Sequence, residues 1–432
     1  MTQPTPIPAI LSEAVPPAFM PRPEPAIHAL ANRIAAADGV ISVVLLGSAA
    51  RGELAMAEVD RRSELFSDLE FLAVTDGRLA GAHRRAITAD AERSAEGFGY
   101  RSRLFHVDIL YRERARLASL PPFIFTYELA ANGRTLAGPD LRGEIRPVSL
   151  ANLDRRNTHE ILIKRLWAIA EALPAAWVRG QPLDALTART LGVVLHRNPL
   201  DVTTALLPEV GALLPTYAKR VGYWQDHPDL PFRPSIDAAL GHDSGVYLRH
   251  CLVERACAAP AADAVAAYRD AITSIVAALA WLEGERAAAP GLFNERPVTR
   301  GEWLAFVRQV VRIAYRAGPL AAVRWACGRR KAALARGLIG LHVAQIDHLE
   351  GRGDAAEVRL ARAAGALAPV AGIVATGSPA RVGKSLHALP FAERWLVARA
   401  LAGRAFWRTV RLGDPDAWRR IARAIAPEEE AV

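Results

Sequence analysis

Cysteine, methionine and lysine are scarce in this chain of 432 residues, which contains three cysteines, three methionines and four lysines. Three cysteines are too few, and odd in number, for the disulfide framework of a small secreted domain. We therefore expect Cys251, Cys257 and Cys327 to be buried thiols in a reducing compartment. Long apolar runs are also lacking, because the longest uncharged stretch, residues 363–380, contains two prolines and three glycines. Such a stretch is a poor membrane-spanning helix.

The beginning of the sequence has no pattern of a secretory signal. A signal peptide needs a basic start and an unbroken apolar segment, whereas the first 25 residues contain eight prolines and two acidic residues. We interpret residues 1–25 as a Pro-rich tail. Together these absences predict a cytoplasmic protein with no membrane contact.

Positive charge is abundant but is concentrated at the end of the chain. Lysine and arginine number 54 against 45 acidic residues, which gives a net charge of +9. Residues 301–432 carry 21 basic and 11 acidic side chains, whereas the first 300 residues are almost neutral. A basic region of this kind can favour an anionic partner such as RNA. Solvated helix faces are the simpler explanation.

Two kinds of pattern divide the chain at Pro147. Before it, compact β-branched or alternating runs predict strands between amphipathic helices. The strands are expected at 40–46, 68–75, 103–111 and near Leu136, and the helices at 26–37, 80–96 and 122–132. After it, helical patterns follow at 151–180, 184–195, 198–221, 246–258, 263–285, 300–317, 319–349, 353–366 and 390–411.

These patterns predict the α+β class. We expect a mixed sheet with flanking helices over residues 26–147, followed by a large all-α region. Proline and glycine near residue 290 suggest dividing that region into a helical domain over 148–290 and a basic helical region over 291–432.

Three carboxylates occupy positions from which they can meet. Asp68 and Glu70 open the second predicted strand, and residues two apart on a strand share a face. In the third predicted strand, alternation places Asp108 opposite Val107 and Ile109. If the two strands pair, all three carboxylates converge on one face. Oxygen ligands of this kind select magnesium or manganese.

A possible phosphate cradle follows the first predicted strand. Gly47 allows the backbone to approach a ligand closely, and Ser48 adds a hydroxyl and an N–H donor. A helix beginning near residue 49 would favour phosphate, onto which Arg51 could place its guanidinium. A phosphate cradle beside metal-binding carboxylates indicates a nucleoside triphosphate and nucleotidyl transfer.

Three segments carry a family resemblance: residues 47–52 (GSAARG), 67–70 (SDLE) and 106–109 (HVDI). In this order they resemble the DNA polymerase beta-type nucleotidyltransferase superfamily, most of all the antibiotic (aminoglycoside-type) nucleotidyltransferases with a helical C-terminal domain. The resemblance covers roughly residues 26–147.

The resemblance implies roles for particular residues. Metal would be held by Asp68, Glu70 and Asp108, and the triphosphate by Gly47, Ser48 and Arg51. The helical domain over 148–290 would bind the acceptor. The base that takes the acceptor proton would be Asp108 or a glutamate of the first following helix, Glu160 or Glu171.

One interval departs from the superfamily pattern. Nineteen residues separate Ser48 from Asp68, which is more than is common in the superfamily. We expect the additional residues, which include 58–66 (EVDRRSELF), to form a small hairpin or a lid. Further on, residues 197–201 (RNPLD) together with Tyr217, Lys219 and Arg220 either face the acceptor cleft or serve packing.

The sequence therefore predicts Mg²⁺- or Mn²⁺-dependent transfer of a nucleoside monophosphate from a triphosphate, with ATP the first candidate. The acceptor would be a hydroxyl of a small molecule or glycan, and pyrophosphate would be released. One alternative is an RNA-directed nucleotidyltransferase that uses the basic C-terminal region as its anchor. Another is a catalytically silent nucleotide-binding scaffold, such as an antitoxin.

Overall fold

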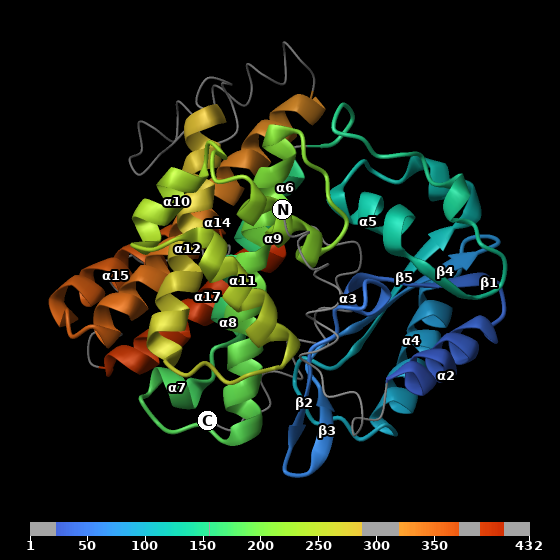
Figure 1. The fold of residues 1–432 in the computed structure, drawn as a ribbon, viewed down its shortest axis with the longest axis horizontal. Helices are drawn as coiled ribbons and strands as arrows, with labels where there is room; N and C mark the ends of the chain where they lie inside the picture. Colours follow the sequence, from blue (N-terminus) through green and yellow to red (C-terminus); the bar gives the residue numbers. More distant parts are fainter. Residues whose placement is uncertain (1–22, 155, 287–318, 371–388, 410–432) are drawn as a thin grey trace, which may run out of the picture. The chain divides into compact units, whose positions relative to one another are not determined.

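The computed structural model describes residues 23–154, 156–286, 319–370 and 389–409 (Figure 1). Almost all of the predicted tail, the helix expected at 300–317 and much of the basic region lie outside these ranges. The chain forms two compact units. Unit 1 comprises residues up to 161 together with 183–267, and unit 2 comprises 162–182 together with residues from 268 to 420. Unit 1 therefore joins the sheet to a group of later helices.

The first part of unit 1 contains the strands and their flanking helices. The strands are β1 (Val40–Leu45), β2 (Met56–Val59), β3 (Arg62–Leu65), β4 (Leu69–Thr75), β5 (Val107–Glu113) and β6 (Arg134–Ala137). The helices are α2 (Glu24–Ala35), α3 (Gly47–Ala50), α4 (Gly81–Glu96), α5 (Ile124–Asn132) and the 3₁₀ turns Arg114–Ser119 and Arg142–Glu144.

A mixed sheet of four strands has the order β5-β4-β1-β6. Strand β4 pairs parallel with β5 and antiparallel with β1, which in turn pairs antiparallel with β6. This sheet, followed by helices, confirms the predicted α+β class. Strand β5 begins four residues later than expected, because a turn in which the Phe105 amide donates to the Ser102 carbonyl precedes it.

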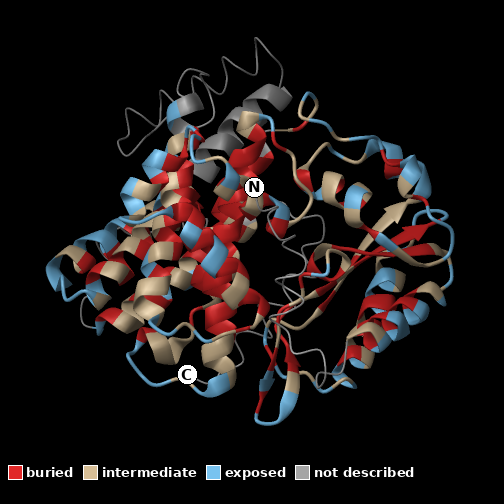
Figure 2. Ribbon diagram, in the orientation of Figure 1, coloured by how far each residue is buried: buried red, intermediate tan, exposed pale blue. Residues whose placement is uncertain are grey.

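Alternate residues of the central strands serve two separate cores, as Figure 2 shows by the buried positions on both sides of the sheet. Val43, Leu45 and Phe71 pack with α2 and α4. Val44 and Leu72 pack on the opposite face, where α5 contributes Leu129. This period of two is the pattern from which the strands were predicted.

The additional residues between Ser48 and Asp68 contain the predicted hairpin, made of β2 and β3. Its two turn residues, Asp60 and Arg61, have φ values of 51° and 62°, as a two-residue turn between right-twisted strands requires. Hairpin residues Ala57 and Val59 pack against Val193 of a later helix. The hairpin thus connects the sheet to the helical part of unit 1.

The later helices of unit 1 are α8 (Ala185–Leu206), the 3₁₀ turn Leu207–Val210, α9 (Tyr217–Asp226), α10 (Arg233–Leu240) and α11 (Ser244–Ala256). Helix α8 is continuous through Pro199, where the prediction of two helices, 184–195 and 198–221, is wrong. The proline removes one backbone donor. Next to it, the Asn198 amide donates to the Val194 carbonyl at 2.7 Å. Helix α10 was not predicted.

Unit 2 is helical throughout its described residues. Its elements are α6 (Arg156–Ala172) and α12 (Ala264–Arg286), which both begin in unit 1, α7 (Ala175–Val178), α14 (Pro319–Leu349), α15 (Gly353–Val370) and α17 (Phe391–Thr409). The single helix predicted over 151–180 is interrupted after Ala172, because Pro174 separates α6 from α7. Residues 264–282 of α12 are long and apolar enough to cross a membrane, a criterion that buried helices also satisfy.

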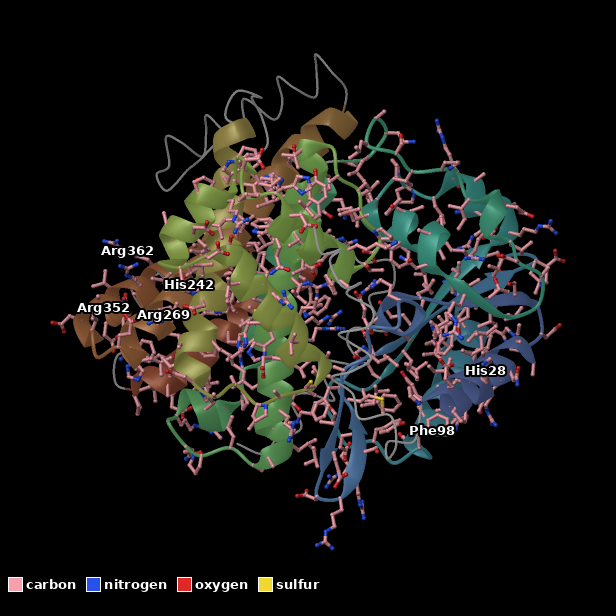
Figure 3. The ribbon with its side chains drawn as sticks, viewed as in Figure 1. His28, Phe98, His242, Arg269, Arg352 and Arg362 are labelled. Atoms are coloured by element: carbon pink, nitrogen blue, oxygen red, sulfur yellow. The ribbon has the colours of Figure 1, made fainter. Side chains whose placement is uncertain are left out.

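Several basic residues of unit 2 have acidic partners. Arg352 and Arg359 both form ion pairs with Asp347, at 2.6 and 2.7 Å. Figure 3 shows Arg352 and Arg362, both on the surface in or next to α15. Positive charge in this part of the described chain is thus partly balanced by acids of the same unit.

Candidate functional site

Strand pairing brings the predicted carboxylates to one end of the sheet. Glu70 and Asp108 are direct neighbours in the parallel register of β4 and β5, and Asp68 immediately precedes β4. Val107 and Ile109 belong to the core beneath α2 and α4. Glu70 and Asp108 therefore lie on the other face, as the alternation predicted.

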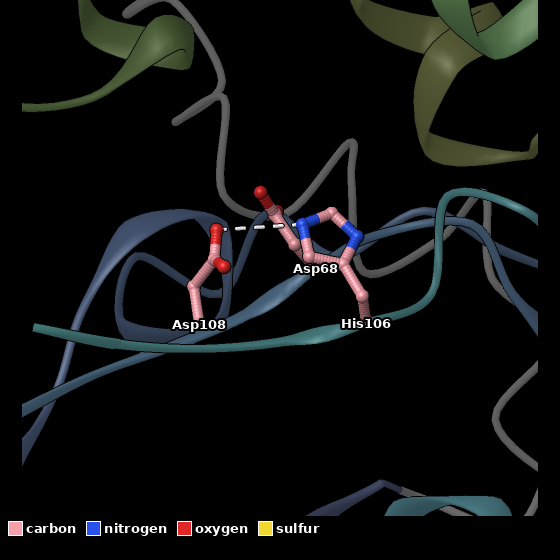
Figure 4. A group of neighbouring side chains, drawn as sticks. All are labelled: Asp68, His106 and Asp108. Carbon is pink, nitrogen blue, oxygen red and sulfur yellow. Dashed lines mark ion pairs between the residues drawn. The ribbon is translucent and has the colours of Figure 1, made fainter. Parts of the chain in front are cut away.

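Three side chains at this end form a group that could hold a metal ion (Figure 4). One ligand atom each from Asp68, His106 and Asp108 lies within 4.8 Å of the others. His106 Nε2 is 3.4 Å from Asp108 Oδ2, and both side chains are 28% exposed. Within the described residues, Nδ1 of His106 has no hydrogen-bond partner.

His106 was not assigned a role from the sequence. It lies two residues before Asp108, so the alternation that selected the aspartate also brings the histidine to the same side. That spacing is the signal by which it could have been found. We call Asp68, Glu70, His106 and Asp108 the carboxylate cluster.

Glu70 lies against the turn after β1. The Leu46 amide donates to the Glu70 carbonyl at 2.8 Å. A Cβ on Gly47 would overlap the Glu70 carboxylate, and Gly47 has a φ of +61°. The structure thus gives Gly47 a function within the protein, which is to leave room for Glu70.

The electrostatics of the carboxylate cluster favour bound protons. Burial and the nearby charges of Asp68 and Asp108 raise the pKa of Glu70 from 4.5 to about 8. Burial opposes the charged form of His106, but Asp108 and the other carboxylates outweigh it and raise its pKa to about 9. A cation that replaces these protons would relieve the same repulsion.

Ser48 lies beside Glu70, in the four-residue helix α3 that begins at Gly47. The helix starts two residues earlier than expected. Ser48 is 5% exposed, and its Oγ has no hydrogen-bond partner among the described residues. A buried hydroxyl without a partner is costly unless a ligand or water satisfies it.

Arg51 forms hydrogen bonds with carboxylates of the protein itself. Its Nε donates to Glu53 at 2.6 Å and its Nη1 to Glu128 at 2.8 Å, and the side chain is only 8% exposed. Arg220 of α9 donates to the other oxygen of Glu128. The guanidinium carbon of Arg51 lies 5.1 Å from the ring centre of Tyr217. We call Arg51, Glu53, Glu128, Tyr217 and Arg220 the Tyr217 network.

The segment 197–201 contributes to this network through Asp201. The Tyr217 hydroxyl donates to Asp201 Oδ1 at 3.0 Å, and both residues are buried. Lys219, by contrast, is exposed, and Arg197 is partly exposed. Asp201, Tyr217 and Arg220 thus join α8 and α9 to α5 and the turn after β1.

The two alternative bases lie on α6. Glu160 belongs to unit 1 and Glu171 to unit 2. Neither is part of the group formed by Asp68, His106 and Asp108. Asp108 is therefore the candidate base that the structure places with the other carboxylates.

The donor atoms of the carboxylate cluster suit a divalent cation. Aspartate oxygens fit magnesium or manganese, whereas a histidine nitrogen beside them also fits a transition metal such as zinc or iron. Searches against protein-family models, curated proteins and solved structures found no match for this chain. The functional argument therefore depends on the geometry of the cluster.

Proposed function

We propose that this chain is a nucleotidyltransferase dependent on Mg²⁺ or Mn²⁺. It would transfer a nucleoside monophosphate, first of all from ATP, to a hydroxyl group of a small molecule or glycan in the cytoplasm. The observation that carries the proposal is the in-register pairing of Glu70 with Asp108 beside Asp68. This pairing assembles like charges next to the Gly47–Ser48 turn.

Each residue would have a defined task. Asp68, Glu70 and Asp108 would hold the metal, which supplies positive charge for the phosphates when it is bound. Ser48 would donate its free hydroxyl to the triphosphate. Arg51 would add positive charge near Glu70, while its hydrogen bonds go to Glu53 and Glu128 of the Tyr217 network.

The reaction would be a displacement at the α-phosphorus. The acceptor oxygen forms a bond to this phosphorus while the bond to the β-phosphate oxygen breaks, and pyrophosphate leaves. Asp108 accepts the proton of the acceptor hydroxyl. Its position next to Glu70 in the sheet supports this assignment.

Calorimetric titration of each nucleoside triphosphate with Mg²⁺ tests the proposal. We expect one triphosphate to bind the wild type, with a loss of binding in Asp68→Asn. Asp76→Asn is the matched control, because Asp76 follows the opposite end of β4 and is exposed. If no triphosphate binds the wild type, or if Asp68→Asn binds it equally well, the proposal is overturned.

A further inference from the structure

Arg255 of α11 is a buried cation for which the proposed function has not yet provided a role. It is 2% exposed, and its Nε has no hydrogen-bond partner among the described residues. Its nearest recorded contact is the ring of Tyr217, whose centre lies 5.6 Å from the guanidinium carbon. A guanidinium has five N–H donors, so leaving it buried without an acceptor is costly.

The other two arginines around the Tyr217 ring have carboxylate partners, whereas Arg255 has none among the described residues. Arg51 and Arg220 also approach this ring, at 5.1 and 5.6 Å, but both donate to Glu128. Arg255 is thus the one described cation at this ring that has no carboxylate within ion-pair distance. Glu53 attracts Arg255 electrostatically but forms its ion pair with Arg51, which leaves the N–H donors of Arg255 available to a ligand.

Arg197 of α8 connects this position to the carboxylate cluster. It is partly exposed, and its positive charge acts on both Arg255 and Glu70. The two arginines repel each other, and burial together with this repulsion outweighs the attraction of Glu53 and lowers the pKa of Arg255. An anion between them would remove the repulsion and remain next to the candidate metal ligands.

We propose that Arg197 and Arg255 form a phosphate-binding subsite beside the carboxylate cluster. The inference rests on the proposed function for the identity of the ligand, which is a phosphate group of the triphosphate donor or of a phosphorylated acceptor. The buried Ser48 hydroxyl, which has no partner among the described residues and follows Gly47, would contact the same ligand or its neighbouring phosphate. Guanidinium forks suit phosphate oxygens geometrically and electrostatically.

The test measures calorimetric binding of three probes: Mg²⁺–ATP, inorganic tripolyphosphate and ribose 5-phosphate. In Arg255→Gln and Arg197→Gln we expect affinity for the bound phosphate probe to fall about tenfold or more. Arg249→Gln is the matched control, because Arg249 is an exposed arginine of the same helix. Loss confined to ATP and tripolyphosphate identifies the donor as the source, and loss confined to ribose 5-phosphate identifies the acceptor.

Binding by Asp68→Asn and by the wild type distinguishes a failure of the phosphate subsite from a failure of the proposed nucleotidyl transfer. If the wild type binds tripolyphosphate or ribose 5-phosphate but not Mg²⁺–ATP, and Arg255→Gln abolishes that binding, the subsite stands and nucleotidyl transfer fails. If Mg²⁺–ATP binding is lost in Asp68→Asn but unchanged in both arginine variants, the subsite is overturned. Equal binding of every probe by the wild type and both arginine variants, or no binding of any probe, also overturns it.

Urea unfolding in phosphate-free buffer provides a readout that a structural arginine would not give. Arg255→Gln removes a buried charge without an acceptor, so we expect its unfolding midpoint to equal or exceed that of the wild type. A lower midpoint would show that Arg255 stabilises the protein and would contradict the ligand role. Arg197→Gln alters a less buried residue and supports the binding test independently of that result.

Discussion

The carboxylate cluster and the Tyr217 network lie on adjoining elements of unit 1, but their charges are partnered differently. In the Tyr217 network, Glu128 accepts hydrogen bonds from two arginines, and Arg51 has a second acid in Glu53. In the carboxylate cluster, Glu70 and Asp108 are neighbours across a strand pair, and Asp68 lies with Asp108 and His106. The first set joins its acids to arginines through hydrogen bonds, whereas the second gathers three acids around one histidine.

We interpret the first set as charges that maintain the fold and propose the second as charges that bind a cation. Removing one partner of a buried ion pair is strongly destabilising, because it leaves a buried charge without compensation. Like charges are costly as they stand, and protons or a cation relieve that cost. The raised pKa of Glu70 is a property of the carboxylate cluster, and the Ser48 hydroxyl without a partner belongs to the turn next to it.

The largest effect is expected when the Tyr217 network is broken at its shared acid. Glu128→Gln leaves Arg51 and Arg220 without the charge that both contact, so we expect a loss of about 3 kcal/mol in the free energy of unfolding. Urea unfolding at pH 7 measures it. Glu144→Gln, which alters the exposed pair with Arg114, is the control and should change little. Equal effects of the two variants would contradict a structural role for the network.

A comparison of alanine substitutions at Gly47 and Gly52 separates two costs, steric overlap with a neighbouring side chain and a strained backbone conformation. Gly47 and Gly52 both have positive φ, but only Gly47 has a side chain, that of Glu70, where a Cβ would be. Gly52→Ala should cost about 1 kcal/mol for the left-handed conformation alone. Gly47→Ala should cost about 2 kcal/mol or more, because Glu70 must also move.

Urea unfolding and Mg²⁺ titration of the two alanine variants measure both consequences. Only the change at position 47 should weaken Mg²⁺ binding, since Glu70 belongs to the candidate metal site. Equal Mg²⁺ binding by both variants would show that the position of Glu70 is unimportant for the metal.

Much of the carboxylate cluster could be predicted because its geometry is local. Alternation along a strand places Glu70 and Asp108 on one face, and the pairing of β4 with β5 needed only to be assumed. His106 follows the same alternation but lies just before β5 begins at Val107. A prediction centred on carboxylates therefore did not include it.

The partners of Arg51 could not be predicted, because they depend on contacts between distant segments. Glu128 lies 77 residues away in sequence, and Arg220 lies a further 92 beyond it. Sequence spacing correctly placed Arg51 next to the Gly47–Ser48 turn. It carried no information on whether phosphate or carboxylate would receive its hydrogen bonds.

The pH dependence of stability should arise from the carboxylate cluster. Raised pKa values for Glu70 and His106 mean that the folded state binds their protons more tightly than the unfolded state. Their contribution is present at low pH and is lost as pH rises, through about 4.5 to 8 for Glu70 and about 6.5 to 9 for His106. The slope is at most about 1.4 kcal/mol per pH unit for each proton.

Mg²⁺ should counteract this loss by taking the place of the protons. We expect its stabilising effect, measured as the shift in urea midpoint, to be larger at pH 8 than at pH 6.5. Glu70→Gln removes one of the titrating groups, so its stability should depend less on pH. A Mg²⁺ effect that is the same at both pH values would argue against binding at these carboxylates.

The smallest expected effect is an increase in the free energy of unfolding. Asp68→Asn removes one negative charge from the carboxylate cluster while keeping the size of the side chain, so we expect a gain of about 1 kcal/mol in metal-free buffer. The same variant should lose the stabilisation by Mg²⁺. Urea unfolding with and without Mg²⁺ measures both. An acid that stabilises the fold, such as Glu128, cannot give this result. If Asp68→Asn instead lowers the midpoint as Glu128→Gln does, the carboxylate cluster is a structural feature like the Tyr217 network, and the distinction between the two regions fails.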